Sequence, residues 1–279
     1  MKQCDLIVAT GGAGLVNAAY SSGTPAYGVG AGNAVIVVDE TADLKDAAGK
    51  IRASKTFDFA TSCSAENSLV IQAGIYDEMI NALKAEGGYV CTTEEKAKLQ
   101  AALWVDGHLN PKMITQSPQV IADIAGLTVS DDVKFFLVEE EGYGPEYPFS
   151  GEKLTVIATV YKYDGAFSNA VDIVNGITEY QGKGHSCGIH TFNEDHILEL
   201  ALNTKVSRMN VNMGQALANT GNWFNAVPAT TSLGCGTWGG NITSENITWK
   251  HMINITNVWR PFDPVIPSDE ELFGNVMNK

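Results

Sequence analysis

Cys63 is the residue whose type and surroundings are best suited to covalent chemistry. It lies in the run SKTFDFATSCSAENS at residues 54–68, after a glycine-rich segment at 28–33 and before an apolar run at 69–71. Small neighbours leave room for a substrate to reach the sulfur. A thiolate is a strong nucleophile near neutral pH and can carry an acyl group as a thioester. The alternative is a buried structural cysteine, since cysteine is among the most buried residue types.

Two glycine-rich segments near the start of the chain are candidates for binding phosphate. Neither matches the G-x-G-x-x-G dinucleotide pattern, because Asn33 and Asn17 stand where the third glycine would be. The segment at 10–12 lies between a predicted strand and a predicted helix. Free backbone N–H groups at such a helix start can hold a pyrophosphate. We therefore assign these residues to cofactor binding: Thr10, Gly11 and Gly12.

The elements that must position Cys63 alternate along the chain, which predicts an α/β architecture. Strands are expected at residues 4–10, 25–29, 34–38, 69–72, 135–138, 154–163, 187–191 and 208–212. Helices are expected at 15–21, 40–54, 75–86, 93–103, 164–176 and 194–204, the second capped by Thr41 or Asp39 and the fourth by Thr92 or Thr93. Residues 241–258 are predicted to form an extended β arm, followed by a proline-containing tail.

Composition excludes several classes of partner. The 279 residues, 44% hydrophobic, suffice for one large or two smaller domains. A net charge of −14 argues against nucleic-acid or anionic-membrane partners, and no apolar run is long enough for a membrane helix. Five scattered cysteines without a C-x-x-C pair suit a reduced, cytoplasmic protein. The histidines other than His185 show no metal-ligand spacing, so we expect no metal.

Several segments together resemble the aldehyde dehydrogenase superfamily, and specifically its CoA-acylating branch. They are ATGG at 9–12, GVGAGN at 28–33, SKTFD at 54–58 leading to Cys63, PFSGEKL at 148–154 and LGCGTWGGN at 233–241. The last segment is similar to the signature of acetaldehyde- and sulfoacetaldehyde-type acylating dehydrogenases. The matches follow one another in order over nearly the whole chain.

The resemblance implies a reaction. In the family a cysteine, matched here by Cys63, attacks an aldehyde, hydride passes to NAD or NADP, and coenzyme A captures the thioester. The position of the glutamate base that activates water in the hydrolytic branch is matched by Val29. An apolar side chain cannot deprotonate water. Release of the acyl group to coenzyme A is therefore expected, and a hydrolytic dehydrogenase is disfavoured.

The resemblance also assigns supporting residues. The glutamate that holds the nicotinamide ribose is matched by Glu152, directly before the strand at 154–163, or by Glu141 in a Glu-x-x-Gly-Pro setting; we prefer Glu152. Gly30 is expected to contact the cofactor. His185 is a candidate for proton transfer during thiol attack, the alternative being a loop histidine that packs on a turn. Arg208 either helps to bind an anionic substrate tail or is structural.

The family comparison divides the chain into three parts. Residues 1–35 are expected to be a remnant of the NAD(P)-binding domain, 36–240 the catalytic domain, and 241–279 an oligomerisation arm of a homo-dimer or tetramer. The substrates implied are a small aldehyde and coenzyme A, and residues 249–258 are similar to the sulfoacetaldehyde group. The family places its oxyanion-stabilising asparagine and most adenosine contacts before residue 1. We therefore expect this chain alone to have little activity, and an inactive structural or assembly fragment is the alternative.

Overall fold

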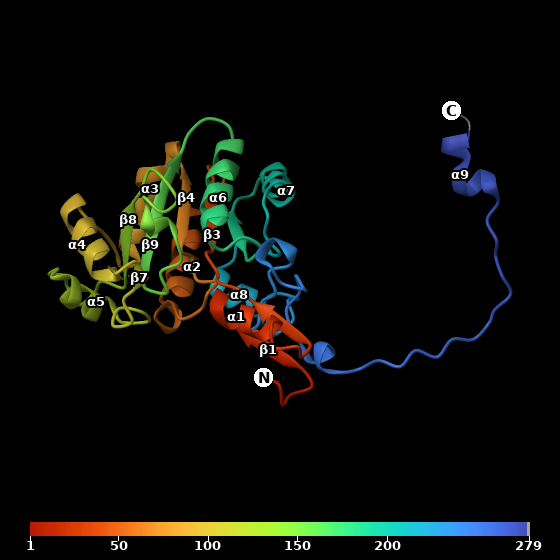
Figure 1. The fold of residues 1–279 in the computed structure, drawn as a ribbon. Helices are drawn as coiled ribbons and strands as arrows, with labels where there is room; N and C mark the ends of the chain where they lie inside the picture. The colour runs from red at the N-terminus through yellow and green to blue at the C-terminus, as the bar shows by residue number, and fades with distance from the viewer. Residues whose placement is uncertain (278–279) are drawn as a thin grey trace. The chain divides into compact units, whose positions relative to one another are not determined.

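The computed structural model describes residues 1–277, which form one unit over Met1–Thr248 and a second that begins at Trp249 (Figure 1). The first unit is built on a seven-stranded parallel sheet in the order β11-β10-β3-β4-β9-β8-β5. The strands of this sheet are β3 (Val35–Val38), β4 (Ser68–Gln72), β5 (Gly88–Val90), β8 (Phe135–Glu139), β9 (Ile157–Tyr163), β10 (Cys187–His190) and β11 (Met209–Val211). The α/β fold class is confirmed.

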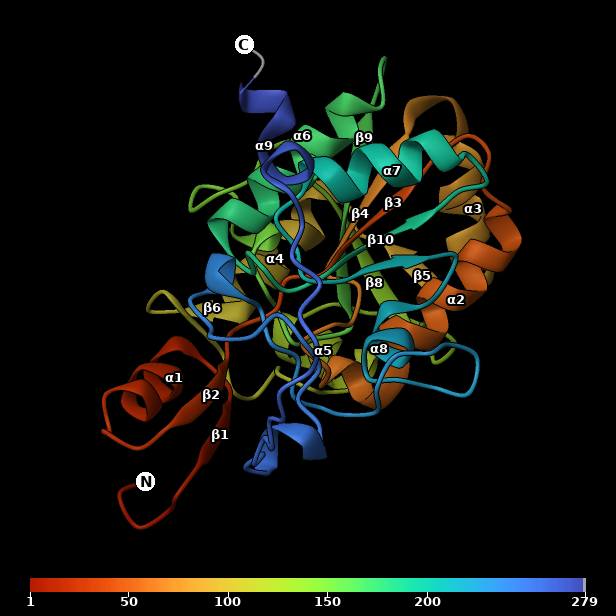
Figure 2. The ribbon, with the colours of Figure 1, turned by 90° about the vertical axis from the view of Figure 1, so that its right-hand side faces the viewer.

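Helices cover both faces of the sheet (Figures 1 and 2). Alternate residues of β3 belong to different cores: Ile36 packs in a cluster with α2, and Val35 in a cluster with α6. Both faces are therefore buried, which explains the uninterrupted apolar runs of the central strands. The helices are α2 (Leu44–Thr56), α3 (Tyr76–Ala85), α4 (Thr93–Leu103), α5 (Pro118–Ala125), α6 (Ser168–Tyr180), α7 (Glu194–Asn203) and α8 (Gln215–Asn219).

The N-cap residue predicted from the sequence is correct for α4 and wrong for α2. Thr92 and Glu95 form a reciprocal capping box at the start of α4, as predicted. The predicted α2 cap at Thr41 or Asp39 is wrong, because Asp43 accepts the backbone N–H groups of Lys45 and Asp46. The carboxylate of Asp39 is buried and accepts hydrogen bonds from Thr41 and Thr191 instead.

The first residues form a small parallel unit in which β1 (Ile7–Thr10) and β2 (Ala26–Val29) flank α1 (Ala13–Tyr20). It has an apolar cluster of its own, made by Ile7, Ala9, Ala19 and Ala26. The predicted strand–turn–helix at 10–12 is confirmed, with Gly12 at the N-cap of α1. Division of the chain at residues 35 and 240 stays a prediction.

The predicted β arm at 241–258 is wrong as a strand. Among the described residues from 241 onward, Asn246 makes one isolated bridge with Leu233, Trp249–Met252 form a 3-10 helix, and Asp269–Met277 form α9. Isoleucine and threonine favour extended backbone locally, but a strand forms only when its N–H and C=O groups pair with those of another strand.

A third sheet, the hairpin of β6 (Trp104–Val105) and β7 (His108–Leu109), lies earlier in the chain. None of the described helices is both long and apolar enough to cross a bilayer.

Candidate active site

The structure brings together the two residues that the sequence assigned to chemistry. Cys63 follows α2 and a short 3-10 helix, and its Sγ lies 3.2 Å from Nε2 of His185. His185 is fully buried just before β10, and its Nδ1 lies 2.9 Å from Oγ of Ser186. A tautomer that carries its proton on Nδ1 donates to Ser186 and turns the Nε2 lone pair toward the thiol. This imidazole is placed to accept the proton of Cys63.

Arg208 fixes the segment that carries the histidine. Its Nη1 donates to the carbonyl of His185 at 2.9 Å, and its Nη2 donates to the carbonyls of Gly234 at 2.5 Å and Ser244 at 3.1 Å. All three acceptors are main-chain oxygens. The structural reading of Arg208 therefore agrees with the geometry, and three of its five N–H donors are used in this way.

The backbone on both sides of Cys63 is tightly constrained. Asp58, Phe59 and Ala60 have φ values of 47°, 48° and 61°, which is the left-handed region that side chains rarely adopt. On the other side, Gly32 approaches Cys63 so closely that an added Cβ would lie 2.1 Å from its carbonyl oxygen. The thiol is therefore positioned by main-chain packing as well as by its hydrogen bond to His185.

A small cavity joins Cys63 to a carboxylate and an amine. It is lined by Cys63, Lys55, Asn67, Glu152 and four other residues. Glu152 Oε1 accepts the Gly32 N–H at 3.1 Å. Glu141, the competing candidate, is exposed to solvent. Of the two glutamates weighed from the sequence, it is Glu152 that shares the cavity of Cys63.

Burial keeps the Cys63–His185 pair uncharged. Burial, together with the nearby Glu152 and Cys235, raises the pKa of the Cys63 thiol to about 12. Burial, together with Arg208, lowers the pKa of His185 to about 3. At neutral pH the pair is therefore a thiol and a neutral imidazole, not a thiolate–imidazolium ion pair.

This neutral state predicts how Cys63 responds to pH. Because the thiolate is the species that reacts, alkylation of Cys63 by iodoacetamide should accelerate about tenfold per pH unit between pH 7 and 10, with no plateau. Mass spectrometry of the Cys63 peptide gives the rate, and the exposed Cys4 in the same digest is an internal standard. A rate that is already maximal near neutrality would show an ion pair and contradict this assignment.

A second pocket lies beside the predicted cofactor glycines. Its lining includes Ala13 and Asn17 of α1, Gly30, Cys235 and Trp238. Of the predicted cofactor residues, Gly30 lines this pocket and Glu152 lines the Cys63 cavity. The other three predicted cofactor residues, Thr10, Gly11 and Gly12, do not line this second pocket. They form the β1–α1 turn, where Thr10 Oγ1 lies 2.9 Å from Ser232 Oγ.

Three buried ionisable residues beside the site were missed in the sequence. Lys55 and Glu66 are almost completely buried, as is Lys153, whose ammonium donates to the carbonyls of Phe149 at 2.5 Å and Gly151 at 3.1 Å. For Lys55 a signal exists. The buried positions of α2 recur with helical spacing, and that spacing puts Lys55 on the core-facing side of the helix. Nothing in the sequence near Glu66 or Lys153 indicates burial.

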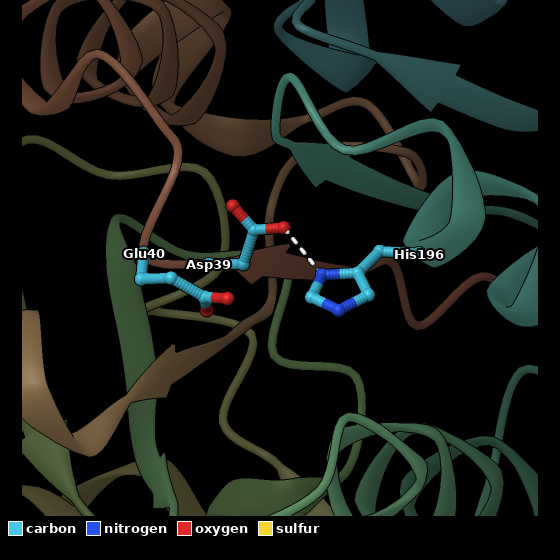
Figure 3. Close-up of side chains that lie close together, drawn as sticks. All are labelled: Asp39, Glu40 and His196. Carbon is cyan, nitrogen blue, oxygen red and sulfur yellow. Dashed lines mark hydrogen bonds and ion pairs between the residues drawn. The ribbon is translucent and has the colours of Figure 1, made fainter.

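A separate cluster of possible metal ligands lies at the end of β3. Ligand atoms of Asp39, Glu40 and His196 lie within 4.8 Å of one another (Figure 3). Asp39 Oδ2 is 2.7 Å from Nδ1 of His196, and its two oxygens also accept from Thr41 and Thr191. Because these contacts already satisfy the buried carboxylate, they explain the cluster as a tie between β3 and α7.

Curated relatives match the chain over nearly all of its length. No family model matches the chain. It is 48% identical, over its whole length, to a sulfoacetaldehyde dehydrogenase from an Acholeplasma species and covers 58% of that protein. It is 45% identical to an acylating sulfoacetaldehyde dehydrogenase from Cupriavidus necator, with 99% of this chain and 56% of the relative covered. The chain is thus similar to acylating aldehyde dehydrogenases and spans a little over half of their length.

Solved structures of acylating aldehyde dehydrogenases share its fold. An acetylating enzyme from Geobacillus thermoglucosidasius matches with a TM-score of 0.90 and 40% identity, covering 95% of this chain and 58% of that one. A Rhodopseudomonas palustris propionaldehyde dehydrogenase, solved with bound CoA and an acylated cysteine, matches at 26% identity and a TM-score of 0.75, covering 86% and 53%. An engineered glycolyl-CoA reductase with bound NADP⁺ matches at 28% identity with the same TM-score, covering 86% and 53%. The chain thus spans a little over half of these acylating dehydrogenases.

Proposed function

We propose that this chain carries the covalent chemistry of an acylating aldehyde dehydrogenase, which converts an aldehyde, coenzyme A and NAD or NADP⁺ into an acyl-CoA and NAD(P)H. The observation that carries the proposal is the contact between Cys63 and His185, at a thiol that also lines a cavity with Glu152. The acylated cysteine and the bound cofactors of the solved relatives support it. Cys63 is the proposed nucleophile, and Gly30 and Glu152 are proposed cofactor contacts, together with the turn at 10–12.

His185 is proposed to move the proton in each thiol step. As the Sγ–carbon bond forms, the thiol proton passes to Nε2 and the aldehyde oxygen becomes an oxyanion. Bound NAD(P)⁺ would accept the hydride from that carbon, and the oxyanion collapses to leave the acyl group on Cys63. His185 releases the first proton to solvent, and its Nε2 then takes the proton of the CoA thiol as the CoA sulfur adds to the thioester carbonyl. The Sγ–carbon bond breaks, and Cys63 takes that proton from His185.

Val29 supports transfer to coenzyme A instead of to water. It is completely buried at the end of β2. By the family resemblance, it matches the position of the base in the hydrolytic branch. A buried valine offers no group to activate a water molecule. The thioester at Cys63 would therefore persist until a thiol arrives.

Sulfoacetaldehyde is the proposed aldehyde, because the Acholeplasma and Cupriavidus relatives carry that name. We also propose a cytoplasmic homo-oligomer, in keeping with five free cysteines and an acidic surface.

The second candidate is a structural or assembly fragment without activity. It is favoured by one observation, namely that the chain spans 58% of the Acholeplasma relative. Such a fragment would keep the fold and Cys63 but would not convert an aldehyde into product.

An aldehyde panel with product analysis separates these functions. The purified chain is assayed alone and mixed with the remaining segment of the Acholeplasma relative, with and without coenzyme A. We expect little activity from the chain alone, and after mixing we expect acyl-CoA and NAD(P)H formed only when coenzyme A is present. Free carboxylic acid formed without coenzyme A would identify a hydrolytic enzyme. Inactivity in every mixture, together with a Cys63 that does not accept acyl groups, would favour the structural fragment.

A further inference from the structure

Asn33 is a buried carboxamide at the end of the glycine-rich segment, and the proposed mechanism does not use it. It directly follows Gly32 and is completely buried. Its Nδ2 donates to the carbonyl of Ser150 at 2.8 Å and to that of Gln181 at 3.0 Å. Its Oδ1 accepts from Nδ2 of Asn67. The side chain of Asn33 therefore joins three segments that lie far apart in the sequence.

A second buried carboxamide extends this contact toward Glu152. The Nδ2 of Asn67 also donates to the carbonyl of Gly151 at 2.6 Å, and Asn67 lines the cavity of Cys63. The carbonyls of Ser150 and Gly151, the two residues directly before Glu152, are thus both held by side-chain amides. A buried carbonyl that loses its partner is costly, so the loop is fixed where these amides lie.

Glu152 itself is attached at two points to the segments that Asn33 joins. Its Oε1 accepts the N–H of Gly32 at 3.1 Å, and its own N–H donates to Oε1 of Gln181 at 2.9 Å. Gly32 is the chain neighbour of Asn33, and Gln181 is one of its acceptors. Both contacts of Glu152 therefore depend on segments that the Asn33 side chain holds together.

We propose that Asn33 is a positioning residue: its carboxamide holds the loop at 148–152 against the glycine-rich segment, so that the carboxylate of Glu152 stays on the Gly32 N–H beside Cys63. Asn33 acts on the site through Glu152. The inference rests on the proposed function in taking Glu152 and Cys63 as parts of one site.

Asparagine suits this position because it offers two donors and an acceptor on a short side chain. Aspartate has the same shape, but an ionised aspartate offers no donor to the two carbonyls. The packing is also close, since a Cβ added at Gly182 would lie 2.4 Å from the Cβ of Asn33. The contact therefore depends on the chemistry of this side chain, which a substitution of similar volume can remove.

The test measures how strongly Glu152 affects Cys63 with and without Asn33. The measured quantity is the rate at which iodoacetamide alkylates Cys63 in the full chain at pH 9, determined on the Cys63 peptide. Glu152→Gln is introduced into the wild type and into Asn33→Leu, which keeps a similar volume and removes the three hydrogen bonds. Burial raises the pKa of Glu152 to about 7, so its carboxylate is ionised at pH 9. Cys63, with a pKa raised to about 12, still reacts through a small thiolate fraction there.

In the wild type we expect Glu152→Gln to accelerate alkylation about threefold, or half a pKa unit, because a nearby carboxylate disfavours the thiolate. In Asn33→Leu the loop is released, and the same substitution should change the rate by less than about 1.5-fold. A threefold acceleration in both backgrounds, or none in the wild type, would overturn the proposal. A purely structural role would lower the stability in urea but leave the effect of Glu152→Gln unchanged.

Asn175→Leu is the matched control. Asn175 lies in α6, and its Nδ2 donates to the carbonyl of Asn203 at the end of α7, at 2.8 Å. In this background Glu152→Gln should accelerate alkylation as it does in the wild type.

If Asn33→Leu does not fold, Asn33→Ser decides. Serine leaves room for water at the freed carbonyls and offers one donor in place of two. The effect of Glu152→Gln should then fall below about twofold, and an effect that stays near threefold would refute the positioning role.

Failure of this inference can be told apart from failure of the proposed function. Wild-type Cys63 that does not react at any pH would remove the proposed nucleophile and the positioning role together. Reactive Cys63 that responds equally to Glu152→Gln with and without Asn33 would remove the positioning role alone.

Discussion

Replacing Cys63 with serine should abolish acyl transfer from acetyl-CoA to the protein, by about 10⁴-fold or more. The reaction is the reverse of the proposed capture step and needs no nicotinamide cofactor. Acetyl leaves the CoA sulfur, bonds to Sγ of Cys63, and the released thiol takes a proton. Serine keeps the shape of the side chain, but its hydroxyl is a far weaker nucleophile in the same cavity. Intact mass spectrometry after incubation with acetyl-CoA measures the acetylated fraction directly.

The control for this experiment is Cys4→Ser, which removes an exposed thiol of the first residues. It should accept acetyl as wild type does, with the label found on the Cys63 peptide. Equal acetylation in the Cys63 variant, or a label on another cysteine, would refute the nucleophile assignment.

Gly32→Ala should disrupt the site from the opposite side. The new Cβ would lie 2.1 Å from the carbonyl oxygen of Cys63 and 3.0 Å from its Cβ, so the two segments cannot keep their spacing. Overpacking of this kind costs about 1–3 kcal/mol. Forced separation would also break the N–H contact from Gly32 to Glu152. We expect a lower free energy of unfolding in urea and a changed rate of Cys63 alkylation.

Gly49→Ala is the matched glycine control. Gly49 lies in α2, and an added Cβ there meets nothing within 4 Å. Alanine favours the helix by up to about 1 kcal/mol, so this variant should be slightly more stable than wild type. If Gly32→Ala matched wild type in both unfolding and alkylation, the close approach of the two segments would be wrong.

Much of the sheet was predictable because its strands carry strong local patterns. The runs at 34–38 and 69–71 are apolar throughout, as strands buried on both faces must be. The edge strand Gly88–Val90 was missed because its glycines were read as the end of the preceding helix. Helix Pro118–Ala125 was missed although Ser117, Pro118 and Gly126 supply its cap, first turn and stop.

The site was less accessible to sequence reasoning. Cys63 and His185 lie 122 residues apart, and only the fold makes their contact. The family resemblance supplied both candidates, but not the geometry between them. Glu66 was missed for a different reason: a charged residue is normally exposed, and here the carboxylate is buried against the start of α8, where it accepts the Gln215 N–H.

The uncharged resting state of Cys63 and His185 has a consequence for the lifetime of the protein. Peroxides and similar oxidants attack thiolates far faster than thiols, and overoxidation to a sulfinic or sulfonic acid is irreversible for most proteins. A thiol that stays protonated until an aldehyde arrives is therefore shielded from oxidative damage between turnovers.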